Sequence, residues 1–234
     1  IAKVSKKKTG TRVRFWADYH IFPSDEGFTW DTLLARARQT AFLVPGLTIN
    51  CFDERGEETI HESFRFDGGV VDFVDWLATD GPVTDTWHIQ GEGTFTETVQ
   101  ALDPESGHLK AVETERTCEV DCALRWGIGY EAQLQSFVNI IATPKGGTHV
   151  AGFEQAVLKV LRAQVDKNAR KLKVSAKDGR PEKDDVLAGL TAVVTVRFPE
   201  PQFEGQTKEI LGTPQIRSVV ARVVGDWLEA KFAS

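Results

Sequence analysis

The sequence predicts an α+β fold, in which meandering strands are followed by helices and a late strand returns to the sheet. Two observations support this prediction. Short runs of alternating or β-branched residues recur between residues 47 and 141, with turn-forming residues between them. Two long stretches of helical periodicity follow, and they enclose the strongly β-branched run 190–198. We therefore expect a sheet that residues 190–198 complete and that the long helices cover.

The N-terminal third is predicted to alternate strands and helices. Alternation of polar and apolar residues indicates strands, and apolar residues at helical spacing, ended by Pro45 and Gly46, indicate a helix. In chain order we expect a strand at 11–16, a helix from Trp30 or Asp31 to Pro45, a hairpin of strands 47–52 and 59–66, and a short amphipathic helix at 70–77.

The remaining two thirds are predicted to contain a protruding hairpin and the long helices. Residues 91–117 are polar and threonine-rich with a turn at 103–107, which is typical of surface elaboration. The other expected elements are paired strands 83–90 and 119–126, strand 133–141, helix 148–171, a helical turn at 184–189, strand 190–198 and helix 214–232.

The composition is that of a globular protein of one large domain or two small ones, with 234 residues, 41% hydrophobic and 26% charged. A run of about 18 apolar residues and a secretory leader are both missing from the sequence, so we expect no membrane and a cytoplasmic location. The sequence has no methionine and starts at Ile1, so we expect a piece of a longer polypeptide.

The three cysteines do not predict a metal site. Cys118 and Cys122 have a spacing that suits metal binding on a helix, but the surrounding residues alternate as in a strand. A strand would hold the two sulfurs about 13 Å apart. Free thiols and no metal are therefore expected.

One segment opposes the net charge of −6. Residues 159–183 carry nine basic residues against three acidic ones. One reading is a solvated helix end and loop. The other is a wall that faces a polyanion.

The loop 201–208 is the best candidate for contact with a ligand. It joins the apolar strand 190–198 to a helix that Thr213 can cap and Pro214 can open, so both ends are anchored. If the loop is extended, Gln206 and Lys208 lie two residues apart on the same side and can converge on one phosphate group. A lysine in a loop is otherwise usually solvated.

No complete catalytic constellation is present. Residues 147–152 have the glycine spacing of a phosphate-binding loop, but Phe153 stands where that loop needs lysine. The histidines lack ligand spacing. His149, beside two glycines at a helix start, is either a ligand contact or a capping or packing residue.

Several motifs in matching order resemble the B subunits of the bacterial type IIA topoisomerases, DNA gyrase and topoisomerase IV. They are Gly10-Thr-Arg-Val-Arg-Phe-Trp16, Phe64-Arg-Phe-Asp-Gly-Gly69, Phe137-Val-Asn139, Gly146-Gly-Thr-His149, Gly152-Phe153, Leu190-Thr-Ala-Val-Val194 and Pro201-Gln-Phe-Glu-Gly-Gln-Thr-Lys208. The insert 91–117, with Gly93-Thr-Phe-Thr-Glu-Thr98, looks most like the topoisomerase IV type of actinobacteria.

The resemblance implies two domains. Residues 1–22 would be the last strand and exit of a GHKL-type ATPase domain, and residues 23–234 the transducer domain. The transducer would have the ribosomal protein S5 domain 2-like fold, a mixed sheet with helices on one face and a left-handed βαβ crossover. The helix 214–234 would lead to the cleavage domain.

The resemblance also implies a divided ATP site. Lys208 would reach the ATP γ-phosphate as a catalytic residue, with Gln206 beside it as a second ATP-binding residue. ATP and Mg²⁺ would be bound mainly by domains absent from this chain. We therefore expect that the fragment alone hydrolyses no ATP and cuts no DNA.

The implied partners are DNA, an A-type subunit in a heterotetramer, and a second B subunit that dimerises on binding ATP. Five basic residues would face the DNA cavity: Lys159, Arg162, Lys167, Arg170 and Lys171. The alternative is a stand-alone RNA- or DNA-binding module with an S5-like fold.

Overall fold

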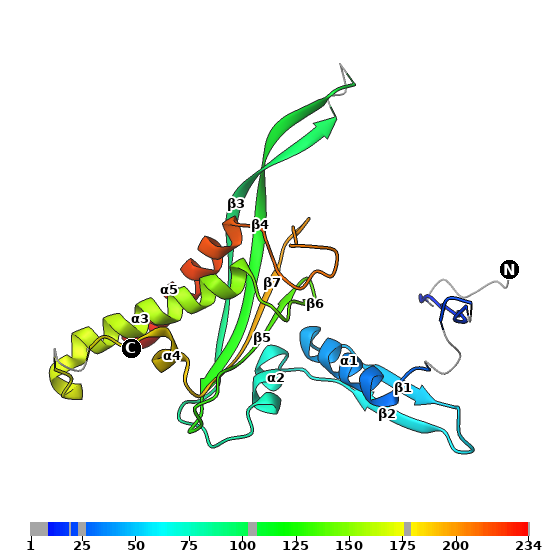
Figure 1. The fold of residues 1–234 in the computed structure, drawn as a ribbon, viewed down its shortest axis with the longest axis horizontal. Coiled ribbons are helices and arrows are strands. Elements are labelled where there is room, and N and C mark those ends of the chain that lie inside the picture. Colours follow the sequence, from blue (N-terminus) through cyan, green and yellow to red (C-terminus); the bar gives the residue numbers. More distant parts are fainter. Residues whose placement is uncertain (1–8, 19, 23–26, 103–106, 176–178, 234) are drawn as a thin grey trace.

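The computed structural model describes residues 9–18, 20–22, 27–102, 107–175 and 179–233 (Figure 1). In chain order its elements are α1 (Trp30–Leu43), β1 (Ile49–Asp53), β2 (Ile60–Phe64), α2 (Val70–Leu77), β3 (Trp87–Leu102), β4 (Leu109–Trp126), β5 (Gln133–Val138), β6 (Ile141–Ala142), α3 (Thr148–Leu172), α4 (Lys183–Leu187), β7 (Leu190–Arg197) and α5 (Gln215–Ala233). The expected α+β composition and every helix that periodicity predicted are confirmed.

The main sheet is mixed and has five strands in the order β3-β4-β7-β5-β6. The late strand β7 lies between two earlier ones, antiparallel to β4 and parallel to β5. The expected return of residues 190–198 to the sheet is therefore confirmed. The parallel pair β5 and β7 is joined through α3, which makes a βαβ unit.

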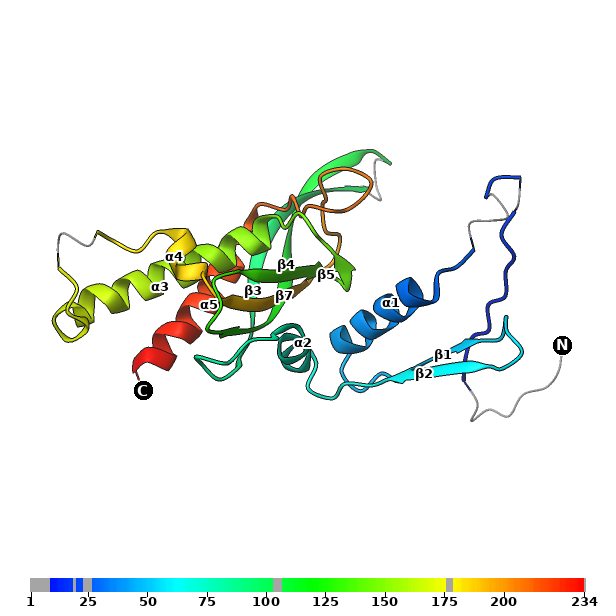
Figure 2. The ribbon, with the colours of Figure 1, turned by 60° about the horizontal axis from the view of Figure 1, so that its bottom comes forward.

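Helices cover both faces of this sheet, so the expectation of helices on one face was wrong. Successive residues of β7 point to opposite faces. Val194 belongs to the core shared with α3 and α5, whereas Val193 packs with Phe73 of α2. Figure 2 shows α2 across the sheet from α3 and α5. Because β7 is apolar at every position from Leu190 to Val196 except for two threonines, and all seven are buried, both faces need cover.

The first two strands form a separate two-stranded sheet beside α1. Its small core joins Ala37 and Ala41 of α1 to Cys51 of β1 and Phe64 of β2. This layer follows the N-terminal segment 9–18, in which the expected strand 11–16 does not form. A strand needs a hydrogen-bonded partner, and none of the described residues pairs with this segment, which leaves Trp16 73% exposed.

The hairpin of β3 and β4 continues far beyond the sheet, as expected for residues 91–117. We call its outer part, residues 94–102 and 109–117, the arm (Figure 1). β7 pairs with β4 only from Glu119 to Trp126, so the arm is a two-stranded ribbon. Of the expected turn at 103–107, residues 103–106 lie outside the described residues.

Strand 133–141 is interrupted. Asn139 and Ile140 have φ angles of 47° and 65°, so the chain turns after Val138 and pairs back as β6. In the described part of the chain, no helix is long and apolar enough to cross a membrane.

Candidate functional site

The loop between β7 and α5 is folded back on itself. The Glu204 amide donates to the Ile210 carbonyl at 2.9 Å, and the Gly212 amide donates to the Gln202 carbonyl at 2.8 Å. These bonds pair the outgoing and returning chain and leave residues 205–209 as the tip. Lys208 is exposed at this tip. The prediction that a fixed loop presents this lysine is consistent with this geometry.

The tip itself is a turn rather than an extended segment. The Lys208 amide donates to the Gly205 carbonyl at 3.3 Å, and Lys208 has a φ of 58°. The alternation that was expected to place Gln206 and Lys208 on one side therefore does not hold, although both are exposed at the tip. The Lys208 Nζ lies 5.9 Å from the centroid of the Phe203 ring, a cation–π distance.

The N-terminus of α3 binds the returning side of the loop. The Thr148 amide donates to the Leu211 carbonyl at 3.0 Å, and the Leu211 amide donates to the Gly146 carbonyl at 3.1 Å. A Cβ at Gly147, whose φ is 133°, would overlap the Leu211 backbone, so this approach requires glycine. Nearer the tip, the Lys145 Nζ lies 2.8 Å from the Glu209 Oε2 and lowers the pKa of that carboxyl.

His149 is buried below this junction and is a packing residue, so of the two alternatives the second is confirmed. Its Nε2 lies 3.2 Å from the Thr143 Oγ1, which is 2.8 Å from the Ser136 Oγ. Burial lowers the pKa of His149 to about 4, so the ring is neutral. Its Nδ1 has no hydrogen-bond partner among the described residues.

Asn139 fixes the end of β7 from which the loop departs. Its Nδ2 donates to the Phe198 carbonyl at 2.8 Å, and its Oδ1 accepts from the Phe198 amide at 3.0 Å. The motifs at 137–139, 146–149 and 201–208, which are distant in sequence, thus meet at one loop. The sequence identified all three motifs, but it carried no signal that they are in contact.

A groove of about 600 Å³ lies along α3, beside α4 and the start of α5. Its charged lining residues are five cations and two carboxylates: Lys159, Arg162, Arg180, Lys183, Arg217, Glu154 and Asp166. Of the five residues expected to face DNA, Lys159 and Arg162 line the groove, whereas Lys167, Arg170 and Lys171 lie farther along α3 outside it.

Ion pairs neutralise only part of this groove. Arg180 pairs with Asp166 at 2.9 Å, and Lys183 pairs with Glu154 at 2.7 Å. Arg162 instead donates to the Pro181 carbonyl at 2.7 Å. Arg217 donates to the Gln155 Oε1 at 3.0 Å. Both guanidinium groups bond neutral acceptors, so the groove keeps a positive excess that suits an anion.

Arg217 was missed by sequence reasoning. It belongs to α5, and the sequence does not show which helix α5 packs against. Its position in the groove follows from the pairing of α3 with α5 in the core.

The cysteines are free and buried, and Cys118 and Cys122 lie in β4 as the alternation predicted. Burial raises the pKa of the Cys118 thiol to about 12. Within the described ranges, no group of three His, Cys, Asp or Glu residues is placed to hold a metal ion.

Comparison with known proteins places this loop and sheet in a family. A model of the DNA gyrase B family matches residues 69–234. The chain belongs to the DNA gyrase B family. This bears out the resemblance to the B subunits of type IIA topoisomerases, and the matched range starts just before α2 and covers the whole five-stranded sheet.

Similar gyrase B proteins are known from several bacteria. The chain is 36% identical to the DNA gyrase B subunit of Streptomyces coelicolor over 244 residues, which cover 95% of the chain and 32% of that relative. It is 38% identical to the DNA gyrase B subunit of Campylobacter jejuni over 229 residues, or 97% of the chain and 26% of the relative. The chain therefore spans about a third or less of these gyrase B proteins.

Solved structures of a gyrase B domain and of a topoisomerase IV domain share the fold. The 43K ATPase domain of Thermus thermophilus gyrase B, solved in complex with an aminocoumarin, matches with a TM-score of 0.65 at 28% identity, over 92% of the chain and 51% of that structure. The topoisomerase IV ATP binding domain of Francisella tularensis matches with a TM-score of 0.63 at 24% identity, over the same shares. At that identity the second match shows the fold alone.

Proposed function

We propose that the chain is the transducer part of the ATPase subunit of a type II DNA topoisomerase, an isomerase. It would couple ATP binding and hydrolysis to gate closure and DNA strand passage. The observation that carries this proposal is the exposed Lys208, held at the tip of a loop whose base is bonded to α3 and to the end of β7. Membership of the DNA gyrase B family supplies the reaction.

The tip suits a phosphate contact. No carboxylate of the described residues forms an ion pair with Lys208, so its charge is available to an anion. We assign Lys208 to the γ-phosphate of ATP as the catalytic residue, with Gln206 as the second ATP-binding residue. A charge-assisted contact of this kind contributes about 1.5 to 3 kcal/mol. It is lost when the γ-phosphate leaves, so it distinguishes ATP from ADP.

The rest of the ATP site would lie outside this chain. Mg²⁺ would accompany ATP and be held mainly by other domains. Residues 1–22 would be the last strand and exit of a GHKL-type ATPase domain. The exposed Trp16 supports this proposal, because the rest of that domain would cover its side chain. Residues 23–234 would form the transducer, with 214–234 leading to the cleavage domain.

The S5 domain 2-like assignment adds a left-handed crossover. The unit β5, α3 and β7 is where this crossover would occur, since it is the parallel pair joined through a helix. The finer resemblance of the arm to the actinobacterial topoisomerase IV type belongs to the same proposal.

DNA, an A-type subunit in a heterotetramer and a second B subunit would be the partners, in the cytoplasm. The positive groove supports a DNA-facing role for Lys159 and Arg162, to which we add Arg217. Lys167, Arg170 and Lys171 would extend this surface along α3.

The same groove supports a second candidate, a stand-alone nucleic-acid-binding module. Such a module making six phosphate contacts would lose about 10³ or more in affinity between 50 and 200 mM salt. A transducer wall would bind DNA weakly at all salt concentrations. Titration of labelled DNA with the purified chain at several salt concentrations separates the two functions.

The decisive experiment is Lys208→Ala in a full-length B subunit that contains this chain, assembled with its A-type partner. We expect ATP hydrolysis and supercoil relaxation at saturating ATP to slow by about a hundredfold or more, because a transition-state donor is lost. Lys110→Ala, an exposed lysine of the arm, is the matched control and should keep the wild-type rate. Relaxation by Lys208→Ala at the wild-type rate would overturn the assignment, as would ATP hydrolysis by the purified 234 residues.

A further inference from the structure

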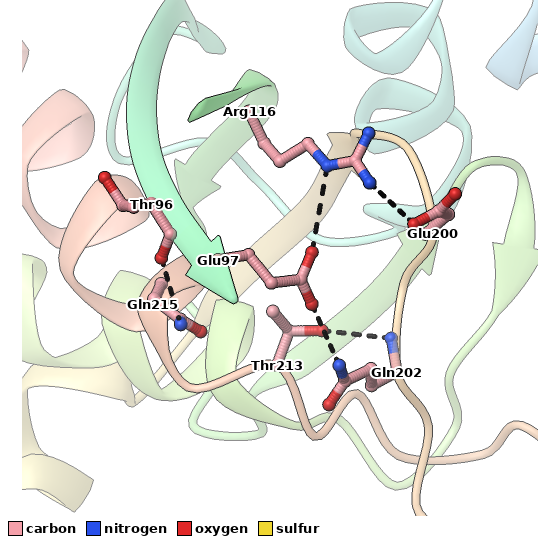
Figure 3. Close-up of polar contacts among 7 residues, drawn as sticks. All are labelled: Thr96, Glu97, Arg116, Glu200, Gln202, Thr213 and Gln215. Carbon is pink, nitrogen blue, oxygen red and sulfur yellow. Dashed lines mark hydrogen bonds and ion pairs between the residues drawn. The ribbon is translucent and has the colours of Figure 1, made fainter. Parts of the chain in front are cut away.

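The arm carries a carboxylate that is buried against the base of the loop. Glu97 of β3 keeps only 10% of its side chain exposed. Its Oε1 accepts a hydrogen bond from the Gln202 Nε2 at 2.9 Å, and its Oε2 lies 3.8 Å from the Arg116 Nε (Figure 3). A buried carboxylate is costly unless it is bonded in this way. The side chain of Gln202 is therefore bonded directly to the arm.

Gln202 is also where the two sides of the loop are joined. Its backbone amide donates to the Thr213 Oγ1 at 3.0 Å, and its carbonyl accepts from the Gly212 amide at 2.8 Å. Lys208 lies between these two bonded sides. Any shift of Gln202 therefore moves the base from which Lys208 projects.

Arg116 makes a second link from the arm. It stands directly opposite Phe95 in the strand register, and its Nη2 donates to the Glu200 Oε2 at 2.6 Å. Phe95 packs edge-to-face on Phe198, with ring centroids 5.8 Å apart. The arm thus contacts the outgoing side of the loop at three successive alternate positions, 198, 200 and 202.

A third link reaches the far end of the loop. The Gln215 Nε2, at the start of α5, donates to the Thr96 carbonyl at 3.4 Å (Figure 3). Contacts on both ends of one loop hold it more firmly than a contact on one end, because the remaining segment has fewer conformations.

We propose that Glu97 and Arg116 are positioning residues for Lys208, which makes the arm a part of the ATP-dependent machinery and not only surface elaboration. The proposal rests on the proposed function of Lys208. Neither residue touches the reacting atoms; both act through the Gln202 and Glu200 side of the loop. A misplacement of about 1 Å in a catalytic group can cost on the order of a hundredfold in rate. A loop loosened at its base, but still bonded to α3, should lose less.

The test uses the full-length B subunit with its A-type partner. Glu97→Ala removes the bond to Gln202, and we expect kcat for ATP hydrolysis to fall about tenfold while KM for ATP changes less than about twofold. Glu97→Gln keeps the length and the acceptor for Gln202, so it should restore most of the rate. Glu113→Ala is the matched control: Glu113 is exposed on the opposite face of the arm, next to Thr114, which is paired with Glu97.

A double-mutant cycle with Lys208→Ala shows whether Glu97 acts through the lysine. We expect the double variant to be no slower than Lys208→Ala alone. If the two losses multiply, or if Glu97→Ala matches Glu113→Ala, the positioning role is wrong. If Lys208→Ala itself has no effect, the proposed function fails instead.

Amide hydrogen exchange of residues 205–209 decides the positioning role in either case. Glu97→Ala and Arg116→Met should speed exchange there at least about threefold relative to Glu113→Ala, while the melting temperature of the protein stays unchanged. Unchanged exchange would overturn the proposal. If Glu97→Ala does not fold, Gln202→Ala removes the same bond from the loop side and is expected to give the same result.

Discussion

Gly152 of α3 lies directly against the backbone of Arg217 in α5, so that a Cβ on Gly152 would overlap the Arg217 carbonyl oxygen. The two helices therefore approach at backbone contact near their N-termini. One of these helices binds the returning side of the Lys208 loop, and the other starts where the loop ends. This single crossing fixes both supports of the loop relative to each other.

The first prediction concerns that crossing. Gly152→Ala should lower the free energy of unfolding by about 1 to 3 kcal/mol, because the helices must separate to admit a methyl group. Gly225→Ala in α5 is the control, since the nearest atom to its added Cβ is 4.0 Å away. It should stabilise the chain by up to about 1 kcal/mol through helix propensity. Urea unfolding measures both; equal effects of the two changes would contradict the close approach.

The second prediction concerns the clasp between Asn139 and Phe198. Asn139→Gly permits the φ of 47° but removes both bonds to Phe198, so we expect a loss of about 1 to 3 kcal/mol in unfolding free energy. Ile140→Gly, at a residue that has a φ of 65° and is 47% exposed, should be neutral or stabilising. Exchange of the Phe198 amide should speed in Asn139→Gly only. Slow exchange in that variant would show that the clasp does not hold the loop.

The third prediction concerns pH. The pKa of His149 is lowered by burial from 6.5 to about 4 in the folded chain. Between these values the unfolded chain binds a proton at His149 that the folded chain does not, so stability falls as pH drops through this window. The loss is on the order of 3 kcal/mol by pH 4. His149→Gln, which can still bond Thr143, should flatten the dependence of the urea unfolding midpoint on pH between about 4 and 6.5. If the urea midpoint of His149→Gln falls with decreasing pH as steeply as that of the wild type, other groups cause the acid sensitivity.

Local sequence patterns predicted most of the elements. The apolar spacing of Val70, Phe73 and Val74 predicted α2, and the β-branched run at 190–198 predicted β7. These patterns show which face of an element is apolar, and the period of that face can be read within each element. The turn at the loop tip also had a local signal, because Gly205 precedes Gln206, and glycine favours the φ of 87° found there.

The pairing between distant elements had no such signal. Glu97 and Gln202 are 105 residues apart, and nothing in either neighbourhood identifies the other as its partner. The cover of the second sheet face by α2 likewise depends on long-range packing. Residues 11–16 show the opposite case, in which a strand pattern is present but its partner is not among the described residues.

The position of β7 has a consequence for the order of folding. Its neighbours β4 and β5 do not pair with each other, since β7 separates them in the sheet. Until residues up to about 197 have been synthesised, the strands of the main sheet can pair only as two hairpins, β3 with β4 and β5 with β6, whose facing edges have no common partner. Insertion of β7 closes both edges in one step, and only afterwards can the segment that carries Lys208 leave a finished sheet. The loop that carries Lys208 is therefore synthesised after every strand of the sheet from which it projects.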